Sequence, residues 1–424
     1  MRYRIIILIC LVSLDIIVFA QGNSTSPYSR YGIGDLAVKG FGQNIAMGGS
    51  AIGLRNPYHL NLVNPASYTA CDSLSFVFEN GISEKNTRYE TYNLKKMTDQ
   101  LNYSYLAIGF PVSRVWSFGA ALLPYSSVGY NIYTDSSYYS AGDTVNTVKS
   151  YSGDGGLNQF VIGTSLKFYN HLSVGINASY LFGYLGYTNI INFLNSSGVV
   201  DENSYNIQHI NKISVNDFSL SYGIQYFNNL NKDIEYTIGL TFEGRNKINA
   251  SRNLLVLRAN KYVTDTLPSS VDKKDYLVLP VSYGIGISLK TDRLLFAADY
   301  SAQDWSESTF LGNRDSLSNS NRCSFGIQFL PNDREINNYL KRIRYRIGGH
   351  YSNTYLNLRS EQLKDYSISF GLGFPIRRSR TSLNISFEMG RRGTTNHQLI
   401  LENYSILHIN LSLHDFWFIH RKFD

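Results

Sequence analysis

Two histidines and a serine lie close together near the end of the chain, in a segment where apolar and polar residues alternate. His408, Ser412 and His414 share one face of this segment if it forms a β-strand, because successive side chains of a strand point to opposite faces. Serine beside histidine can supply the nucleophile and base of a hydrolase. The sequence places no acid or amide partner beside them, and its eight histidines are dispersed, with no Cys-x-x-Cys pair to suggest a metal site. We therefore expect no enzymatic activity, no metal and no cofactor.

Three arginines follow the same alternation in an earlier segment. Arg342, Arg344 and Arg346 share one face of a predicted strand whose other face is apolar. An inward guanidinium can receive the carboxylate headgroup of a ligand through a bidentate contact. It can equally pair with inward acids, of which Asp299 and Glu388 are candidates, and hold a neighbouring segment, because buried charge must be paired. Both roles remain open.

The elements that position these side chains are strands of unusual length. A soluble sandwich would bury its apolar faces between two sheets of shorter strands, whereas a transmembrane barrel turns them to lipid. We therefore predict an all-β protein that forms a transmembrane antiparallel β-barrel. The longest single-faced apolar set consists of Leu277, Leu279, Val281, Tyr283, Ile285, Ile287 and Leu289.

We count fourteen strands, and bacterial single-chain barrels have an even number. Short turns alternate with long polar loops, which in such barrels lie in the periplasm and outside the cell, respectively. The residues before the first strand should thus begin in the periplasm. The strands are predicted at 74–87, 101–111, 115–130, 156–169, 172–188, 213–228, 234–252, 275–290, 292–305, 320–330, 341–357, 362–375, 380–392 and 399–414, and the polar loops at 88–100, 131–155, 189–212, 253–274 and 306–319.

The start of the chain has the pattern of a secretory signal peptide. Arg2 and Arg4 precede an apolar run that ends in small residues, with cleavage expected after Ala20. An N-terminal anchor helix is the alternative, although the run is shorter than the roughly 20 apolar residues that a span requires. Residues 1–20 are therefore predicted to be a signal peptide that directs the chain to the cell envelope.

Composition supports a barrel and excludes other classes. Aromatic residues make up 14%, which suits the two interfacial girdles of a barrel, and the mean hydropathy of -0.19 excludes a helical membrane bundle. The formal net charge of +7 is scattered rather than clustered, so nucleic acid is not an expected partner, while lipopolysaccharide contact is. Cys323 should face lipid, which argues against a disulfide with Cys71.

The fifty residues after the signal peptide do not alternate. They are rich in glycine and small residues, above all between Gly40 and Ala51, as expected for a segment that packs closely inside a barrel. A disordered periplasmic tail is the alternative, but such a tail would not keep Phe41, Ile45 and Met47. We therefore predict a hatch at 21–72, a barrel at 73–414 and a C-terminal periplasmic tail at 415–424.

The run Asn64-Pro65-Ala66, placed after the glycine-rich stretch and just before the first predicted strand, resembles the hatch motif of the FadL outer-membrane transporters. The resemblance extends over nearly the whole mature chain. It implies a fourteen-stranded barrel plugged by an N-terminal hatch. The stretch Ser26 to Asp35 and the ending Trp417 to Lys422 are more similar to the Bacteroidetes branch of such barrels.

The resemblance implies a channel in the outer membrane of a Gram-negative cell, gated by the hatch, that takes up hydrophobic compounds such as long-chain fatty acids. The alternative function is that of a barrel component of a surface-assembly or protein-secretion machinery. A continuous apolar cavity between hatch and wall would favour the first function, and a large apolar patch on the external loops would favour the second. We expect a monomer that contacts outer-membrane lipids, lipopolysaccharide and a hydrophobic small molecule; the sequence identifies no protein partner.

Overall fold

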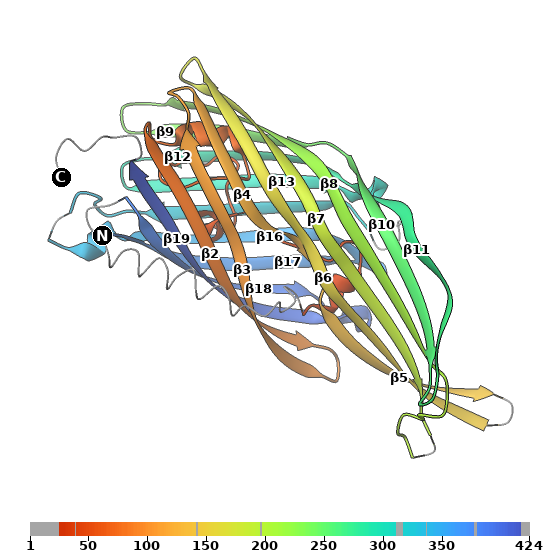
Figure 1. Cartoon of the computed structure of the whole chain (residues 1–424). Helices are drawn as coiled ribbons and strands as arrows, with labels where there is room; N and C mark the ends of the chain where they lie inside the picture. Colours follow the sequence, from red (N-terminus) through yellow and green to blue (C-terminus); the bar gives the residue numbers. More distant parts are fainter. Residues whose placement is uncertain are drawn as a thin grey trace, which may run out of the picture.

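The computed structural model describes residues 25–416 except 39, 141–142, 196, 311–316, 336 and 377–379. The predicted signal peptide and residues 417–424 of the predicted C-terminal tail lie outside the described residues. The chain forms a closed barrel of fourteen antiparallel strands, which confirms the predicted fold class and strand number (Figure 1). No helix in the described part of the chain is long and apolar enough to cross a membrane.

Ten barrel strands are continuous and four are interrupted. The last strand pairs with the first and closes the barrel. The continuous strands are β2 (Ser75–Glu90), β3 (Lys95–Pro111), β6 (Asp143–Phe168), β7 (Leu172–Phe193), β8 (Asn206–Asn229), β15 (Ser320–Phe329), β16 (Arg344–Leu358), β17 (Glu361–Pro375), β18 (Ser382–Gly393) and β19 (Leu401–Phe416). The interrupted strands are β4 (Trp116–Ser127) with β5 (Tyr130–Ser140), β9 (Glu235–Glu243) with β10 (Asn246–Ala259), β11 (Thr264–Leu279) with β12 (Val281–Lys290), and β13 (Leu294–Asp304) with β14 (Thr309–Phe310).

The single apolar face predicted from Leu277 to Leu289 is wrong. Leu277 and Leu279 are buried inside the barrel, whereas Ile285 and Ile287 lie on its outer surface, 50% and 44% exposed. Pro280 separates the two halves, because it has no N–H to donate and so interrupts the strand between β11 and β12. The strand therefore changes the face that it turns outward at this residue.

The predicted long loops at 131–155 and 253–274 are also corrected, because most of their residues continue the strands. The segment 131–155 forms most of β5 and the first half of β6, and 253–274 contains the hairpin between β10 and β11. At about 3.4 Å per residue, the 26 residues of β6 extend well beyond an apolar band of about 25 Å. We call the end that carries these hairpins the long-hairpin end (lower right in Figure 1), and the opposite end the short-turn end.

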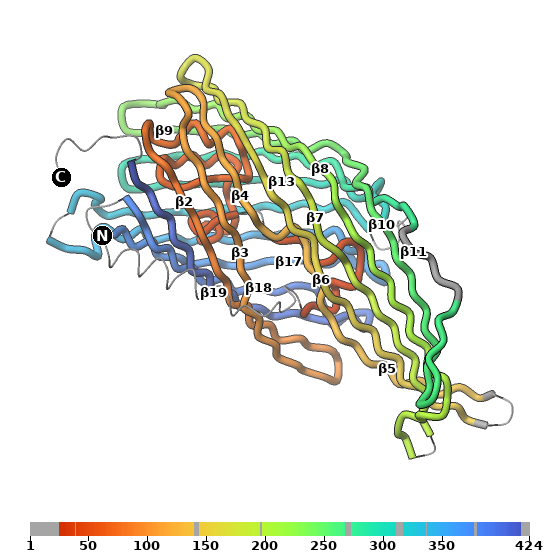
Figure 2. The backbone as a smooth tube through the Cα atoms, in the orientation of Figure 1, coloured from red at the N-terminus to blue at the C-terminus, as the bar shows by residue number. Residues whose placement is uncertain are grey.

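Residues 25–72, here called the N-terminal segment, run through the inside of the barrel (Figure 2). The segment forms four short elements that contact the inner wall, and most of its side chains are buried. These elements are η2 (Pro27–Arg30), β1 (Asp35–Leu36), α2 (Gly42–Ile45) and η3 (Pro65–Ala70), while η4 (Trp305–Glu307), η5 (Tyr339–Arg342) and η6 (Asn396–Gln398) belong to the barrel.

An apolar cluster fills the barrel on the side of the long-hairpin end. Tyr28 and Ile33 of the N-terminal segment are buried in it, against wall residues such as Leu157, Leu185 and Leu356. We call these residues the outer apolar cluster. The inner wall is therefore apolar over this part of the barrel, in contrast to the polar interior of an open pore.

Candidate functional site

The interface between the N-terminal segment and the inner wall is the candidate functional site, and Asn64 lies at its centre. The side chain of Asn64 is fully buried and begins η3 by accepting a hydrogen bond from the Ala66 N–H at 3.2 Å. Its Nδ2 donates to the carbonyl of Ile52 at 2.9 Å and to that of Ile224 in β8 at 3.2 Å. One side chain thus joins two parts of the segment to the wall. This contact gives the Asn-Pro-Ala motif a physical basis, while its role in gating remains a prediction.

Glycines in the wall allow the segment to approach this closely. A Cβ added to Gly223 would lie 2.1 Å from Oδ1 of Asn64, and one added to Gly175 would lie 2.5 Å from the carbonyl carbon of Pro65. Arg55 reinforces the contact, because its guanidinium donates to Gln225 Oε1 at 2.9 Å and lies 3.9 Å from the centre of the Phe227 ring. The Asn-Pro-Ala motif therefore packs directly against the wall, at positions where glycines leave room for it.

A second attachment lies on β13. The carboxylate of Asp299 accepts hydrogen bonds from the backbone N–H groups of Ala51 and Ile52, at 2.5 and 2.8 Å. Beside it, Arg322 of β15 donates to the carbonyl of Gly48 at 3.2 Å. Asp299, predicted as an inward acid, therefore holds backbone of the segment rather than pairing with Arg342, Arg344 or Arg346.

A third attachment holds the part of the segment that reaches the outer apolar cluster. Nη1 of Arg392 in β18 lies 2.9 Å from Asp35 Oδ1 and 3.7 Å from Glu402 Oε2. Ser26 donates a hydrogen bond to Glu402, and the hydroxyl of Tyr28 donates to the Ile400 carbonyl at 2.5 Å. All three charged side chains are largely buried, so the two carboxylates depend on the one guanidinium that they share.

The three predicted arginines do not form one ladder. Arg342 is not on a strand, because Asn338 caps the 3-10 helix η5 and β16 begins only at Arg344. Arg344 and Arg346 do face inward, and Arg344 lies 3.8 Å from Asp333. Arg346 is buried and donates to Gln328 Oε1 and Asn384 Oδ1, both at 2.8 Å. Its Nη2 has no hydrogen-bond partner among the described residues.

The face predicted to hold His408, Ser412 and His414 does point inward, and Ser412 meets a histidine of the N-terminal segment. Its hydroxyl donates to Glu79 Oε1 at 3.0 Å, and Nδ1 of His59 lies 2.9 Å from the same oxygen. Burial lowers the pKa of His59, so the neutral ring donates to the carboxylate. The Ser412 hydroxyl also lies 3.0 Å from Nδ1 of His59 itself. Because the same ring nitrogen faces both the serine and the carboxylate, it cannot accept from Ser412 while it donates to Glu79, so the arrangement differs from a serine–histidine–acid relay, which uses both ring nitrogens.

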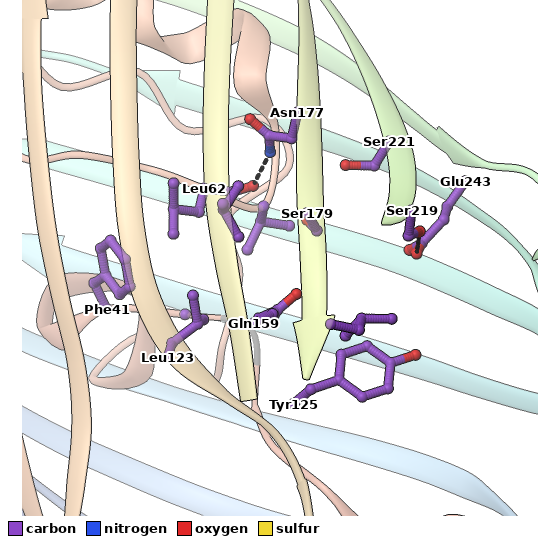
Figure 3. Close-up of a pocket in the computed structure, with 14 residues that line it drawn as sticks. Phe41, Leu62, Leu123, Tyr125, Gln159, Asn177, Ser179, Ser219, Ser221 and Glu243 are labelled. Atoms are coloured by element: carbon purple, nitrogen blue, oxygen red, sulfur yellow. Dashed lines mark hydrogen bonds between the residues drawn. The ribbon is translucent and has the colours of Figure 1, made fainter. Parts of the chain in front are cut away.

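A small cavity lies between the N-terminal segment and the wall (Figure 3). Its volume is about 40 Å³, room for about one water molecule. Phe41, Leu123 and Tyr125 supply apolar surface, and Gln159 and Glu243 polar surface. This cavity is not the continuous apolar passage that would by itself favour a channel.

Sequence reasoning missed several residues of this interface, namely Asp35, Arg55, His59, Glu79, Arg322, Arg392 and Glu402. The missed residues on strands could have been found as charges on an inward face. Arg322, for example, alternates with outward residues that include Cys323. Cys323 is exposed, as predicted. Those in the segment carry no such signal, because the segment has no periodic pattern.

Asn64→Ala should loosen the N-terminal segment without preventing barrel assembly. The substitution removes the donor to the carbonyls of Ile52, Ile224 and Leu240 and the cap of η3, and each buried polar group left unpaired costs about 1–3 kcal/mol. We expect faster proteolysis of residues 25–72 together with unchanged heat-modifiable gel mobility. Asn61→Ala is a control that removes an amide whose hydrogen bonds, among the described residues, stay within the segment: it donates to Ala51 and Leu54 and accepts from the Val63 N–H. Equal proteolysis of the two variants would contradict the role of the wall contact.

Comparisons with known proteins identify a family and a fold. The model of the BamG family matches residues 1–424. No curated protein matches the sequence.

Among solved structures, the toluene transporter TbuX of Ralstonia pickettii is similar with a TM-score of 0.57 and 14% identity, covering 89% of this chain and 98% of its own. The toluene transporter TodX of Pseudomonas putida gives 0.53 and 16%, covering 92% and 100%. A Pseudomonas aeruginosa FadL homologue gives 0.54 and 12%, covering 90% and 98%. These likenesses confirm a FadL-like fold, while membership of a Bacteroidetes branch remains a prediction.

Proposed function

We propose that this chain, which belongs to the BamG family, is an outer-membrane channel for hydrophobic compounds and that its N-terminal segment is the gate. A water-filled pore offers an apolar solute no favourable solvent, so the solute needs an apolar path. The outer apolar cluster supplies apolar side chains on the inner wall over one part of such a path. The structural neighbours whose names describe hydrocarbon or toluene transport share this fold.

The observation that carries the proposal is the way the N-terminal segment occupies the barrel. It fills the interior, yet it is held by hydrogen bonds and ion pairs of single side chains, such as Asn64, Asp299 and Arg392. The cavity of about 40 Å³ is too small for a hydrocarbon of several carbons. Passage of a solute therefore requires the segment to move.

The site favours a neutral solute near the cavity, and a buried guanidinium elsewhere keeps one nitrogen for a carboxylate. Glu243 lines the cavity and would repel an anionic headgroup. Arg346, nearer the short-turn end, is buried and keeps Nη2 unbonded among the described residues. We infer that long-chain fatty acids, which gain about 0.8 kcal/mol per buried CH₂, contact this nitrogen through their carboxylate.

Fixing the N-terminal segment to the wall should abolish uptake. The hydroxyls of Ser50 and Ser324 lie 3.3 Å apart, so cysteines at both positions, in a chain lacking Cys71 and Cys323, should form a disulfide. Uptake of radiolabelled toluene and oleate by cells should fall when the disulfide forms and recover on reduction.

A matched disulfide within the wall controls for effects on the barrel itself. Ser83 and Ser104 have hydroxyls 3.1 Å apart on β2 and β3, and cysteines there leave the segment free. Uptake that is equal for the two oxidised variants would show that the segment is not a gate.

The second candidate function is that of a barrel component of an assembly or secretion machinery, and two observations favour it. The interior is filled by the protein's own residues, with Tyr28 and Ile33 packed in the outer apolar cluster. The hairpins at the long-hairpin end carry exposed aromatic side chains, including Tyr92 and Tyr139. Uptake unaffected by the Ser50–Ser324 tether would favour this function over a channel.

A further inference from the structure

One strand edge at the long-hairpin end has no partner among the described residues. β3 and β4 pair only from Leu106 opposite Leu122 to Pro111 opposite Ser117. Beyond these pairs the two strands separate: β3 continues with β2, and β5 pairs with β6 (Figure 1). The second edge of β5, Tyr130–Ser140, therefore presents backbone N–H and C=O groups that no described strand pairs.

The base of this edge already accepts an added strand. β1 of the N-terminal segment pairs antiparallel with β4, placing Asp35 opposite Ser127 and Leu36 opposite Ser126. This short pairing ends before β5 begins. The edge is thus geometrically competent for strand addition, and the part of β5 beyond buried Tyr130 and the contact with η2 remains available.

The free edge of β5 lacks the side chains that usually protect a strand edge from association. Proteins usually protect an edge with charged residues or proline, and β5 contains one charged residue and no proline. Tyr133 and Tyr139 of β5 are 64% and 80% exposed. Across the separation, Tyr92 and Met97 of the β2–β3 hairpin are 94% and 63% exposed. Exposed apolar groups that flank a free edge mark a protein-binding surface.

A second copy of this chain is a poor occupant. Asp135 lies at the centre of Tyr130–Ser140, so two β5 edges paired antiparallel about a twofold axis would place the two Asp135 carboxylates opposite each other. Like charges directly opposite across strands are destabilising. The occupant should instead carry a basic residue at this position.

We propose that the free edge of β5 binds an extended segment of a partner protein. The segment adds antiparallel to Tyr130–Ser140, places a lysine or arginine opposite Asp135, and packs apolar side chains against Tyr133 and Tyr139. This interaction site is independent of the proposed channel and uses no residue of the lumen.

The test uses two synthetic peptides as long as β5, each alternating valine and threonine, one with lysine and one with glutamate at its centre. Binding to the purified full-length protein in detergent is measured by fluorescence anisotropy. The lysine peptide should bind the natural protein more tightly than the glutamate peptide, and Asp135→Lys should reverse the order, each by roughly fivefold. Glu202→Lys makes the same charge change at the neighbouring β7–β8 connection and should leave the order unchanged.

The outcomes are distinguishable. Equal binding of the two peptides to the natural protein and to Asp135→Lys, or no binding to either, would overturn the proposal. A purified protein that sediments as a dimer, more tightly associated in Asp135→Asn, would assign the edge to a second copy and also overturn it. Retained heat-modifiable mobility shows that the substituted barrels are folded.

Discussion

Asp299→Ala should release the central part of the N-terminal segment while the barrel remains folded. The carboxylate accepts the N–H groups of Ala51 and Ile52, and alanine leaves both buried donors unpaired. At about 1–3 kcal/mol for each unpaired group, the population of the released state should rise at least about 30-fold. Neither donor has another acceptor on β13, so the wall cannot easily compensate.

The release can be measured by thiol labelling. Ser50 is fully buried next to the attachment, so Ser50→Cys in a chain lacking Cys71 and Cys323 should react slowly with a water-soluble maleimide. Asp299→Ala should accelerate the reaction, and heat-modifiable gel mobility should stay unchanged. Asp299→Asn keeps an acceptor oxygen and should react at close to the slow rate. Equal labelling of the alanine and asparagine variants would contradict the proposed attachment.

Strand alternation predicted the barrel well because its cause is local. Each residue of a regular strand turns to the face opposite its neighbour, so the inward direction of Ser412, Arg344 and Arg346 followed directly from the sequence. The same rule failed at Pro280, where an interrupted strand changed its outward face. Because proline has no N–H to donate, its presence in the sequence should have led us to predict two strand segments there instead of one.

The long hairpins were missed for a different reason. Segments such as 131–155 are rich in tyrosine, serine and threonine and lack a continuous apolar face, so they read as polar loops. In the structure these residues pair with one another, and their strands extend those of the barrel wall. Pairing between neighbouring chain segments, rather than burial of one face, stabilises them.

The contacts of the candidate site could be predicted only in part. The glycine content of the N-terminal segment indicated close packing, and the structure agrees at Gly48, where an added Cβ would lie 2.3 Å from the carbonyl oxygen of Gly349 in the wall. The partners of Asn64 include the Ile224 carbonyl, 160 residues away in the sequence. No local pattern specifies such a backbone acceptor, and the three-dimensional register of the barrel determines it.

Arg392→Met should detach the part of the N-terminal segment from Ser26 to Asp35, which reaches the outer apolar cluster, and should leave the part near Ser50 in place. The guanidinium lies between Asp35 and Glu402, and its loss leaves two buried carboxylates without their shared cation. Removing one partner of a buried ion cluster typically costs about 3–5 kcal/mol. Detachment lets Asp35 reach solvent and so relieves most of this cost.

Two buried serines distinguish this outcome from that of Asp299→Ala. Ser29 lies in η2 and Ser50 at the centre of the segment, and both are fully buried. In Arg392→Met, a cysteine at 29 should become reactive to maleimide while one at 50 stays protected; in Asp299→Ala, the order should reverse. Neutralising the carboxylates in the triple variant Arg392→Met, Asp35→Asn, Glu402→Gln should restore protection at 29, because no buried charge then lacks a partner. Simultaneous exposure of both positions in Arg392→Met would mean that the segment is released as one unit, so that the ion cluster and Asp299 would not act as separate attachments.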